Sequence, residues 1–296
     1  MYKVCRYIMF KGLLGAAALT TSMGTAMAAG PALTGIDLKL INDSNPAKAE
    51  FERDIEATSS VLGRVTASLY SRDLGSSAAH ASGFSLNASA SYEHNADLEG
   101  LGESRYRVGA GWFRENKASG LAPLWSFSLG LGYLDSETHI RDSAIVDLLG
   151  SVNFQPTNFF DSTIGARIEL RQADTEVFDT TKSTLFITGN FSPIARLVLR
   201  AGFRVVLGHE VSTATPTLNI VNTAIAIEPD DAFGGRDANR FAYLLDANSA
   251  ILEAGLGYVF SDAFEANLLY RVVSTEAEND ISYDRNMLEL TLSFSL

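Results

Sequence analysis

The 296-residue sequence contains a single cysteine, Cys5, and few prolines. One cysteine cannot form an intramolecular disulfide. The sequence also lacks a long apolar run after residue 28, although a membrane-spanning helix needs about 20 predominantly apolar residues. Basic residues are outnumbered, because 23 Lys and Arg against 35 Asp and Glu give a formal net charge of −12. This acidic balance argues against nucleic acid as a partner.

Residues 1–28 predict a secretory signal peptide. The basic residues that open it are Lys3, Arg6 and Lys11. A short apolar core at 13–19 follows, and 26–28 reads Ala-Met-Ala, an A-x-A cleavage site. We expect the mature chain to start at Ala29. Loss of the three basic residues lowers the formal charge from −12 to −15, and loss of the cysteine excludes thiol chemistry and a lipid anchor.

Apolar and polar residues alternate through most of the remaining chain, most regularly at residues 287–296. A period of two places successive side chains on opposite faces of a β-strand. Each alternating segment is about long enough to cross a membrane as a tilted strand. Besides 287–296, these segments are 34–42, 56–70, 84–92, 106–112, 125–133, 146–154, 164–170, 185–191, 197–207, 252–260 and 264–272.

A chain of such strands that ends on one of them resembles an integral outer-membrane β-barrel of a Gram-negative bacterium. In that class the last strand is the signal for the assembly machinery, a role that the resemblance gives to Phe294 and Leu296. The resemblance implies an all-β, transmembrane, antiparallel up-and-down β-barrel of about twelve strands, with ten or fourteen as alternatives. Residues 29–296 would form this single domain in the outer membrane, in contact with the lipid bilayer and lipopolysaccharide. Aromatic residues at strand ends favour it over a secreted β-sandwich.

The connections between the predicted strands alternate in length. Short ones lie at 155–161, 192–195 and 261–263, and longer polar ones at 135–143, 173–183, 209–248 and 275–286. Short turns face the periplasm in this class, so the long connections should be extracellular.

The longest of these, at about 209–248, has an apolar middle, 218–227, that could form a hairpin above the membrane or fold into the lumen. Asp230, Asp231 and Asp237 of this loop are candidates for binding a cation or a partner. The alternative is a solvated acidic loop without a ligand.

The same alternation predicts which charged side chains face the lumen. The cations are Arg167, Arg171, Arg196, Arg200, Arg204 and Arg271, and the acids are Glu56, Glu253, Glu265 and Glu289. In one hypothesis the arginines face Glu56 and Glu289 across a water-filled lumen and select polar or anionic solutes. In the other, the charges pair side to side and plug a sealed structural or surface-interaction barrel, whose acidic loops contact lipopolysaccharide or a partner. The leading prediction is a small porin-like channel, with the 209–248 loop as its constriction or lid.

Catalysis is not expected. The histidines are His80, His94, His139 and His209, and none lies in a recognisable catalytic or metal-binding motif. His209 beside Glu210 is the nearest approach to a catalytic dyad, but an exposed loop histidine explains it better. The sequence predicts no catalytic residue, no cofactor and no metal site.

Overall fold

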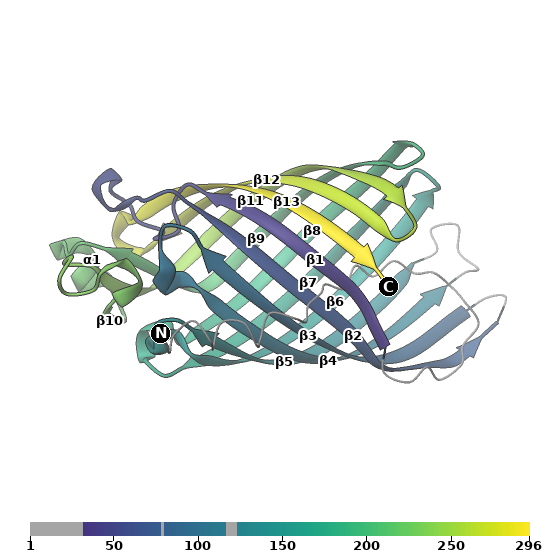
Figure 1. The fold of residues 1–296 in the computed structure, drawn as a ribbon, viewed down its shortest axis with the longest axis horizontal. Coiled ribbons are helices and arrows are strands. Elements are labelled where there is room, and N and C mark those ends of the chain that lie inside the picture. Colours follow the sequence, from purple (N-terminus) through teal and green to yellow (C-terminus); the bar gives the residue numbers. More distant parts are fainter. Residues whose placement is uncertain (1–31, 78–79, 117–122) are drawn as a thin grey trace, which may run out of the picture.

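The computed structural model describes residues 32–296 except 78–79 and 117–122, so the predicted signal peptide lies outside the described residues. Twelve long antiparallel strands form one sheet that closes into a barrel, because β9 pairs with β11 and β13 pairs with β1 (Figure 1). The predicted fold class is therefore confirmed. The strands are β1 (Ala32–Asp43), β2 (Thr58–Ser76), β3 (His80–Asn95), β4 (Glu103–Asn116), β5 (Leu124–Ser136), β6 (Ser143–Thr157), β7 (Phe160–Ala173), β8 (Thr180–Ile194), β9 (Leu197–Ala214), β11 (Phe241–Ser261), β12 (Phe264–Ala277) and β13 (Ser282–Ser295).

The remaining elements are short and lie in the connections. A strand of four residues, β10 (Ala226–Pro229), pairs with β11 outside the ring, and the helix α1 is Leu218–Thr223. Single 3₁₀ turns are η1 (Glu52–Asp54), η2 (Glu99–Leu101), η3 (His139–Arg141), η4 (Glu176–Phe178), η5 (Asp231–Phe233) and η6 (Glu278–Asp280). Among the described residues, no helix is both long and apolar enough to span a membrane.

The outer face of the barrel is an apolar band. Leu129 and Leu131 of β5 are 42% and 56% exposed, and Leu252 of β11 is 60% exposed. Every strand contributes such residues at alternate positions, as the period of two requires. A continuous apolar surface of this extent is far beyond what a water-soluble monomer exposes, but it is what hydrocarbon requires of a membrane-spanning barrel.

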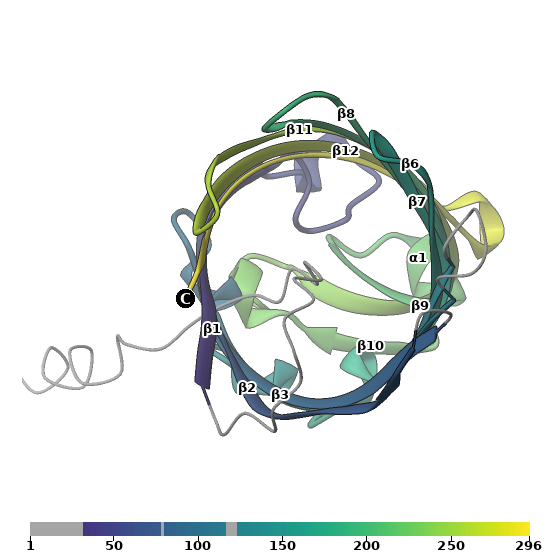
Figure 2. The ribbon, with the colours of Figure 1, turned by 90° about the vertical axis from the view of Figure 1, so that its right-hand side faces the viewer.

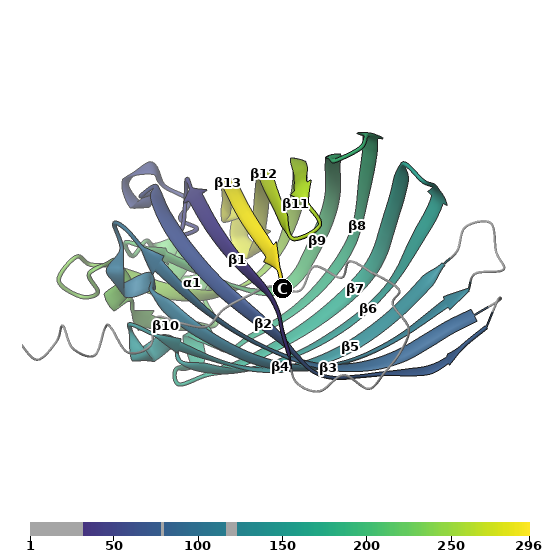
Figure 3. The same ribbon diagram turned by 45° about the vertical axis from the view of Figure 1, so that its right-hand side comes forward.

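Closure depends on the first and last strands, which lie side by side in Figure 3. Ile36 of β1 is opposite Phe294 of β13, and the pairing continues to Asp43 opposite Met287. On the other side of β13, Phe294 stacks on Phe264 of β12 with ring centroids 4.7 Å apart. No strand edge is left unpaired in the membrane, where an unsatisfied backbone group would cost several kcal/mol.

The two ends of the barrel differ. Two-residue turns at 158–159, 195–196 and 262–263 connect strands at one end, as predicted, and the connections 44–57, 137–142, 174–179 and 215–240 lie at the other. We call these the short-turn end and the long-loop end. The predicted 209–248 loop is shorter than expected, because β9 continues to Ala214 and β11 begins opposite it at Phe241. The strands extend past the apolar band, where neither face contacts lipid and the alternation that marks a membrane strand disappears.

Two connections fold inward over the long-loop end: the first loop, residues 44–57, and the long loop, residues 215–240. Figure 2 looks along the barrel and shows α1 and β10 within the outline of the ring. The first loop reaches β9, where the Thr213 amide donates to the Ala47 carbonyl at 2.8 Å. Ala47 and Phe233 belong to one buried apolar cluster that joins the two loops. We call the two loops together the cap.

Candidate functional site

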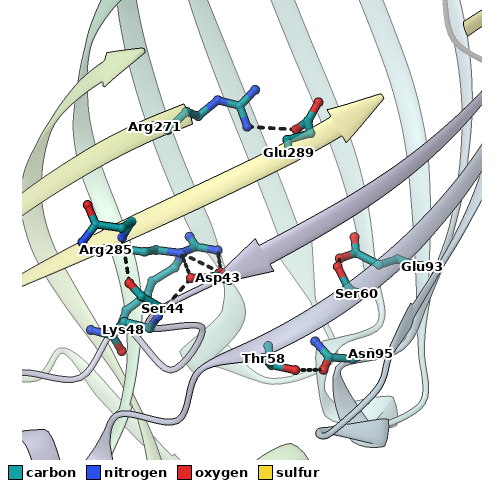
Figure 4. A network of polar contacts seen from close by, with 12 residues as sticks. Asp43, Ser44, Lys48, Thr58, Ser60, Glu93, Asn95, Arg271, Arg285 and Glu289 are labelled. Carbon is teal, nitrogen blue, oxygen red and sulfur yellow. Dashed lines mark hydrogen bonds and ion pairs between the residues drawn. The ribbon is translucent and has the colours of Figure 1, made fainter. Parts of the chain in front are cut away.

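A row of ion pairs follows the lumen wall from β9 to β1. Glu253 of β11 accepts from Arg204 of β9 at 3.0 Å and lies 3.4 Å from Arg271 of β12. Glu289 of β13 lies 3.0 Å from Arg271 and 2.6 Å from Lys39 of β1. Figure 4 shows the contact between Arg271 and Glu289. Each carboxylate in this row is therefore shared by two cations on neighbouring strands.

A second row lies on the wall formed by β4 to β7. Arg107 of β4 binds Asp147 of β6 through two hydrogen bonds of 2.7 and 3.0 Å. Arg167 of β7 lies 3.6 Å from Asp147 and 2.7 Å from Glu169. Between β4 and β6, Gly130 of β5 lies directly under the first pair, and a Cβ there would collide with Asp147 and come within 2.5 Å of Arg107 Nε. The absence of a side chain at Gly130 makes room for this ion pair.

The other predicted lumen arginines have different environments. Arg171 of β7 donates to the Ser143 hydroxyl at 2.8 Å and to the Arg141 carbonyl at 2.7 Å. Arg200 of β9 has a buried Nε with no hydrogen-bond partner among the described residues. Arg196 is not on a strand, because it occupies the turn between β8 and β9 with a φ of 75° and is exposed.

Two of the predicted acids also differ from expectation. Glu56 precedes β2, so it belongs to the first loop, where it pairs with Arg240 at 3.1 Å. Glu265 is on β12 near the short-turn end and accepts from the Asn267 amide at 2.9 Å. Glu56 therefore does not line the wall of the ring, and Glu289 pairs with Arg271 and Lys39 on the two neighbouring strands.

The cap is held by buried carboxylates. Asp54 of η1 is fully buried, lies 2.9 Å from Arg240 of the long loop, and accepts from the backbone amide and hydroxyl of Thr215. Its partner Arg240 also donates to the backbone carbonyls of Arg53 and Asp54. Removing one member of such a pair leaves a buried charge without compensation. Asp54 therefore joins the first loop to the long loop.

The acidic candidates of the long loop are not equivalent. Asp230 is fully buried, pairs with Arg141 of η3 at 2.5 Å and accepts from the Thr213 hydroxyl at 2.6 Å. Its donors leave it no free face for a cation. Asp231 and Asp237 are exposed, so only these two can meet a ligand from solution.

Glu210 anchors the first loop to the barrel wall. It lies 2.5 Å from Lys48 Nζ and also binds Lys182 of β8, while the Lys48 carbonyl accepts from Ser212 at 2.7 Å. Burial acts to raise the pKa of Glu210, but attraction to both lysines outweighs it and lowers the pKa to about 2. Burial lowers the pKa of Lys48 to about 8, against the attraction of Glu210. Both groups are charged at neutral pH.

The histidine dyad considered above does not form. His209 and Glu210 are consecutive residues of β9, so their side chains point to opposite faces, and Glu210 is occupied by the two lysines. Asp135, His139 and Asp142 bring one ligand atom each within 4.8 Å of one another. Asp142 already accepts from the Ser136 amide at 2.7 Å and lies 3.2 Å from His139 Nδ1.

Several residues that build the site were not singled out from the sequence. Lys39 alternates with Leu38 and Leu40, so the period of two could have identified it as a lumen residue. Lys48, Lys182 and Arg285 lay in predicted connections and gave no such signal. Arg285 binds Asp43 at the junction of β13 and β1, close to Lys48 (Figure 4). Lys48, Lys182 and Arg285 were missed because the strands and their ion pairs continue beyond the part of the barrel that faces lipid.

No protein-family model and no curated protein matches the sequence. Among solved structures, an outer membrane channel from Pseudomonas putida F1 aligns with a TM-score of 0.55 at 10% identity, over 91% of this chain and 97% of that chain. The NanC porin aligns with a TM-score of 0.46 at 9% identity, over 88% of this chain and 100% of that porin chain. The outer membrane channel DcaP of Acinetobacter baumannii aligns with a TM-score of 0.45 at 8% identity, over 92% of this chain and 99% of that chain.

The first of these likenesses extends over nearly the whole of both chains, and at 10% identity it concerns the fold. Together with the apolar outer band and the closed ring, it identifies this chain as a β-barrel of the Gram-negative outer-membrane type.

Proposed function

We propose that the protein is a passive channel for small polar solutes with a preference for anions. The observation that carries the proposal is the excess of positive charge along one lumen wall and beneath the cap. There, five cations share three carboxylates: Lys39, Lys48, Lys182, Arg204 and Arg271 against Glu210, Glu253 and Glu289. A lumen lined with cations lowers the electrostatic barrier to anions and raises it for cations. The fold shared with an outer membrane channel supports the same function.

The cap would act as the constriction of this channel. It folds over the long-loop end and joins the first loop to β9 and to the long loop. The predicted role of the long loop as a lid is thus extended to the first loop. Three of the connections at the opposite end are turns of two residues, too short to reach across a barrel of this size.

The test is the conductance of refolded mature protein in a planar bilayer, with a salt gradient to measure the reversal potential. We expect discrete steps with anion preference. Arg200→Ala should reduce the preference, because Arg200 has an unpaired Nε among the described residues, and adding Arg204→Ala should reduce it further. Arg196→Ala, in the exposed turn, is the control. An unchanged reversal potential in the double variant contradicts the assignment of selectivity to these arginines.

A second function is supported by the packing of the cap: a sealed barrel that acts through its surface. Asp54 and Asp230 are fully buried among loop residues, an arrangement that could close the lumen. In this proposal Asp231 and Asp237 contact lipopolysaccharide, through divalent cations, or a protein partner. A correctly folded protein that never conducts would favour it.

Assembly is proposed to depend on the last strand. Phe294 and Leu296 are 36% and 68% exposed at the short-turn end, which makes both side chains accessible to an assembly factor.

A further inference from the structure

A cavity of about 250 Å³ lies in the lumen wall under the cap, against β9, β11, β12 and β13. Lys48 of the first loop and Glu210 border it on the cap side. This volume is below the ~300–1,000 Å³ of pockets for drug-sized ligands. The cavity therefore suits a small solute.

The lining follows from the strand register. Val273 of β12 is opposite Ile251 of β11 on one side and Arg285 of β13 on the other. One step nearer the cap, Thr275 is opposite Ser249 and Tyr283. Because these residues share the inward phase with Glu253 and Arg271, they form two stacked rows on the lumen face.

Part of this lining is apolar, which is unexpected for a lumen that is otherwise charged. Val206, Ile251, Val273 and Met287 lie on four consecutive strands of the ring and border the cavity together. None of them belongs to the buried apolar clusters that hold the cap. The apolar patch is therefore available to a ligand.

The polar part of the lining offers donors. Tyr283 is 6% exposed, and its hydroxyl makes no hydrogen bond within the described part of the chain. Burial raises the pKa of Tyr283, so the phenol keeps its proton. Arg204 also has an unpartnered Nε, whereas the Ser249 and Thr275 hydroxyls bond to each other at 2.8 Å. A buried donor without a partner is destabilising, and a ligand with acceptor oxygens would satisfy it.

We propose that this cavity binds a small carboxylate with an apolar body. The carboxylate accepts from Tyr283 and the neighbouring cations, and the body packs on Ile251, Val273 and Met287. An inorganic anion leaves the apolar patch uncovered, and a hydrocarbon leaves the donors without acceptors. The inference rests on the proposed channel function and names the class of solute that the channel retains.

The test uses benzoate, titrated by calorimetry into the refolded mature chain in detergent micelles, with benzamide as its uncharged counterpart. We expect saturable binding of one benzoate per chain, at least ~10-fold tighter than benzamide, since a charged hydrogen bond contributes ~1.5–3 kcal/mol. Tyr283→Phe should weaken benzoate binding ~2–10-fold. The control is Tyr270→Phe, whose hydroxyl lies on the exposed outer face and bonds Asn286 at 3.0 Å.

Ile251→Asn is a second variant, which tests the apolar patch and replaces Tyr283→Phe if that variant does not fold. It should weaken benzoate binding, because Ile251 packs on the apolar body of the ligand. Equal affinity for benzoate and benzamide, or unchanged benzoate affinity in the folded variants, overturns the proposal. Conductance of the same preparation separates the two claims. A conducting protein without a benzoate site overturns only the cavity assignment, whereas a protein that binds benzoate without conducting overturns only the channel.

Discussion

At the scale of single residues, the lumen shows how small side chains and charged ones are arranged together. The ion pair between Arg107 and Asp147 spans β5, and it can do so only because residue 130 is a glycine. A similar relation holds on the other wall, where a Cβ at Gly202 would come within 2.5 Å of the Glu253 carboxylate. At these two positions the inward glycines leave space for a specific ion pair.

Gly130→Ala should therefore destabilise the barrel by about 1–3 kcal/mol, because overpacking forces neighbouring side chains out of position. The measurement is the urea midpoint of the protein in lipid vesicles, followed by tryptophan fluorescence. Gly63→Ala is the matched control, since the nearest atom to its new Cβ would be Leu38 Cδ2 at 3.9 Å. Equal midpoints for the two variants would show that Arg107 and Asp147 do not need the space.

At the scale of elements, the first loop depends on one carboxylate of β9. Glu210 binds Lys48 of that loop and Lys182 of β8, and its charge also acts on Tyr283 and Arg285 of β13. Its pKa falls from an ordinary value of 4.5 to about 2 in the folded protein. The unfolded chain thus binds a proton more readily than the folded one between these values, and stability must fall as the pH falls through this range.

The Glu210 contribution should be fully present above pH 5 and reduced by about 2 kcal/mol at pH 3. We expect the urea midpoint at pH 3, relative to pH 6, to fall further in the wild type than in Glu210→Gln. Glu228→Gln, which changes an exposed acid of the long loop, should behave as the wild type. If Glu210→Gln loses as much stability on acidification as the wild type, Glu210 is not the anchor.

At the scale of the whole molecule, a closed barrel separates the part that crosses the membrane from the part that controls access. The ring is complete without the long loop, because Ala214 and Phe241 are already opposite each other in register. The loop nevertheless holds the first loop through Arg240 and Asp54. The barrel wall and its cap are therefore separable.

Replacing residues 215–240 by Asn-Gly should keep the barrel and open its long-loop end, since two residues can close a hairpin between paired positions. We expect single-channel conductance to rise several-fold, because the long loop is removed and the first loop loses its contacts with Arg240 and Thr215. Asp237→Asn, at an exposed position of the same loop, should leave conductance unchanged. A shortened protein that folds but conducts no better would place the constriction elsewhere.

The sequence alone determined the fold class and the membrane-facing side chains, because the period of two is a local property that needs no partner. It indicated about twelve strands, and the structure fixes the number at twelve. The sequence also predicted the inward phase of Arg204, Glu253, Arg271 and Glu289. The sequence could not show which of these side chains contact one another, because the contacts depend on strand register and on closure of the barrel.

Only the tertiary structure decided the rest. It placed Glu56 in the cap and Arg196 in a turn, and it buried Asp230, which the sequence presents as one of several loop acids. Strand ends beyond the lipid carry no apolar alternation, so the sequence there resembles a loop. The cap and the cavity beneath it arise from segments far apart in the chain, such as Lys48 and Glu210, which only the closed barrel brings together.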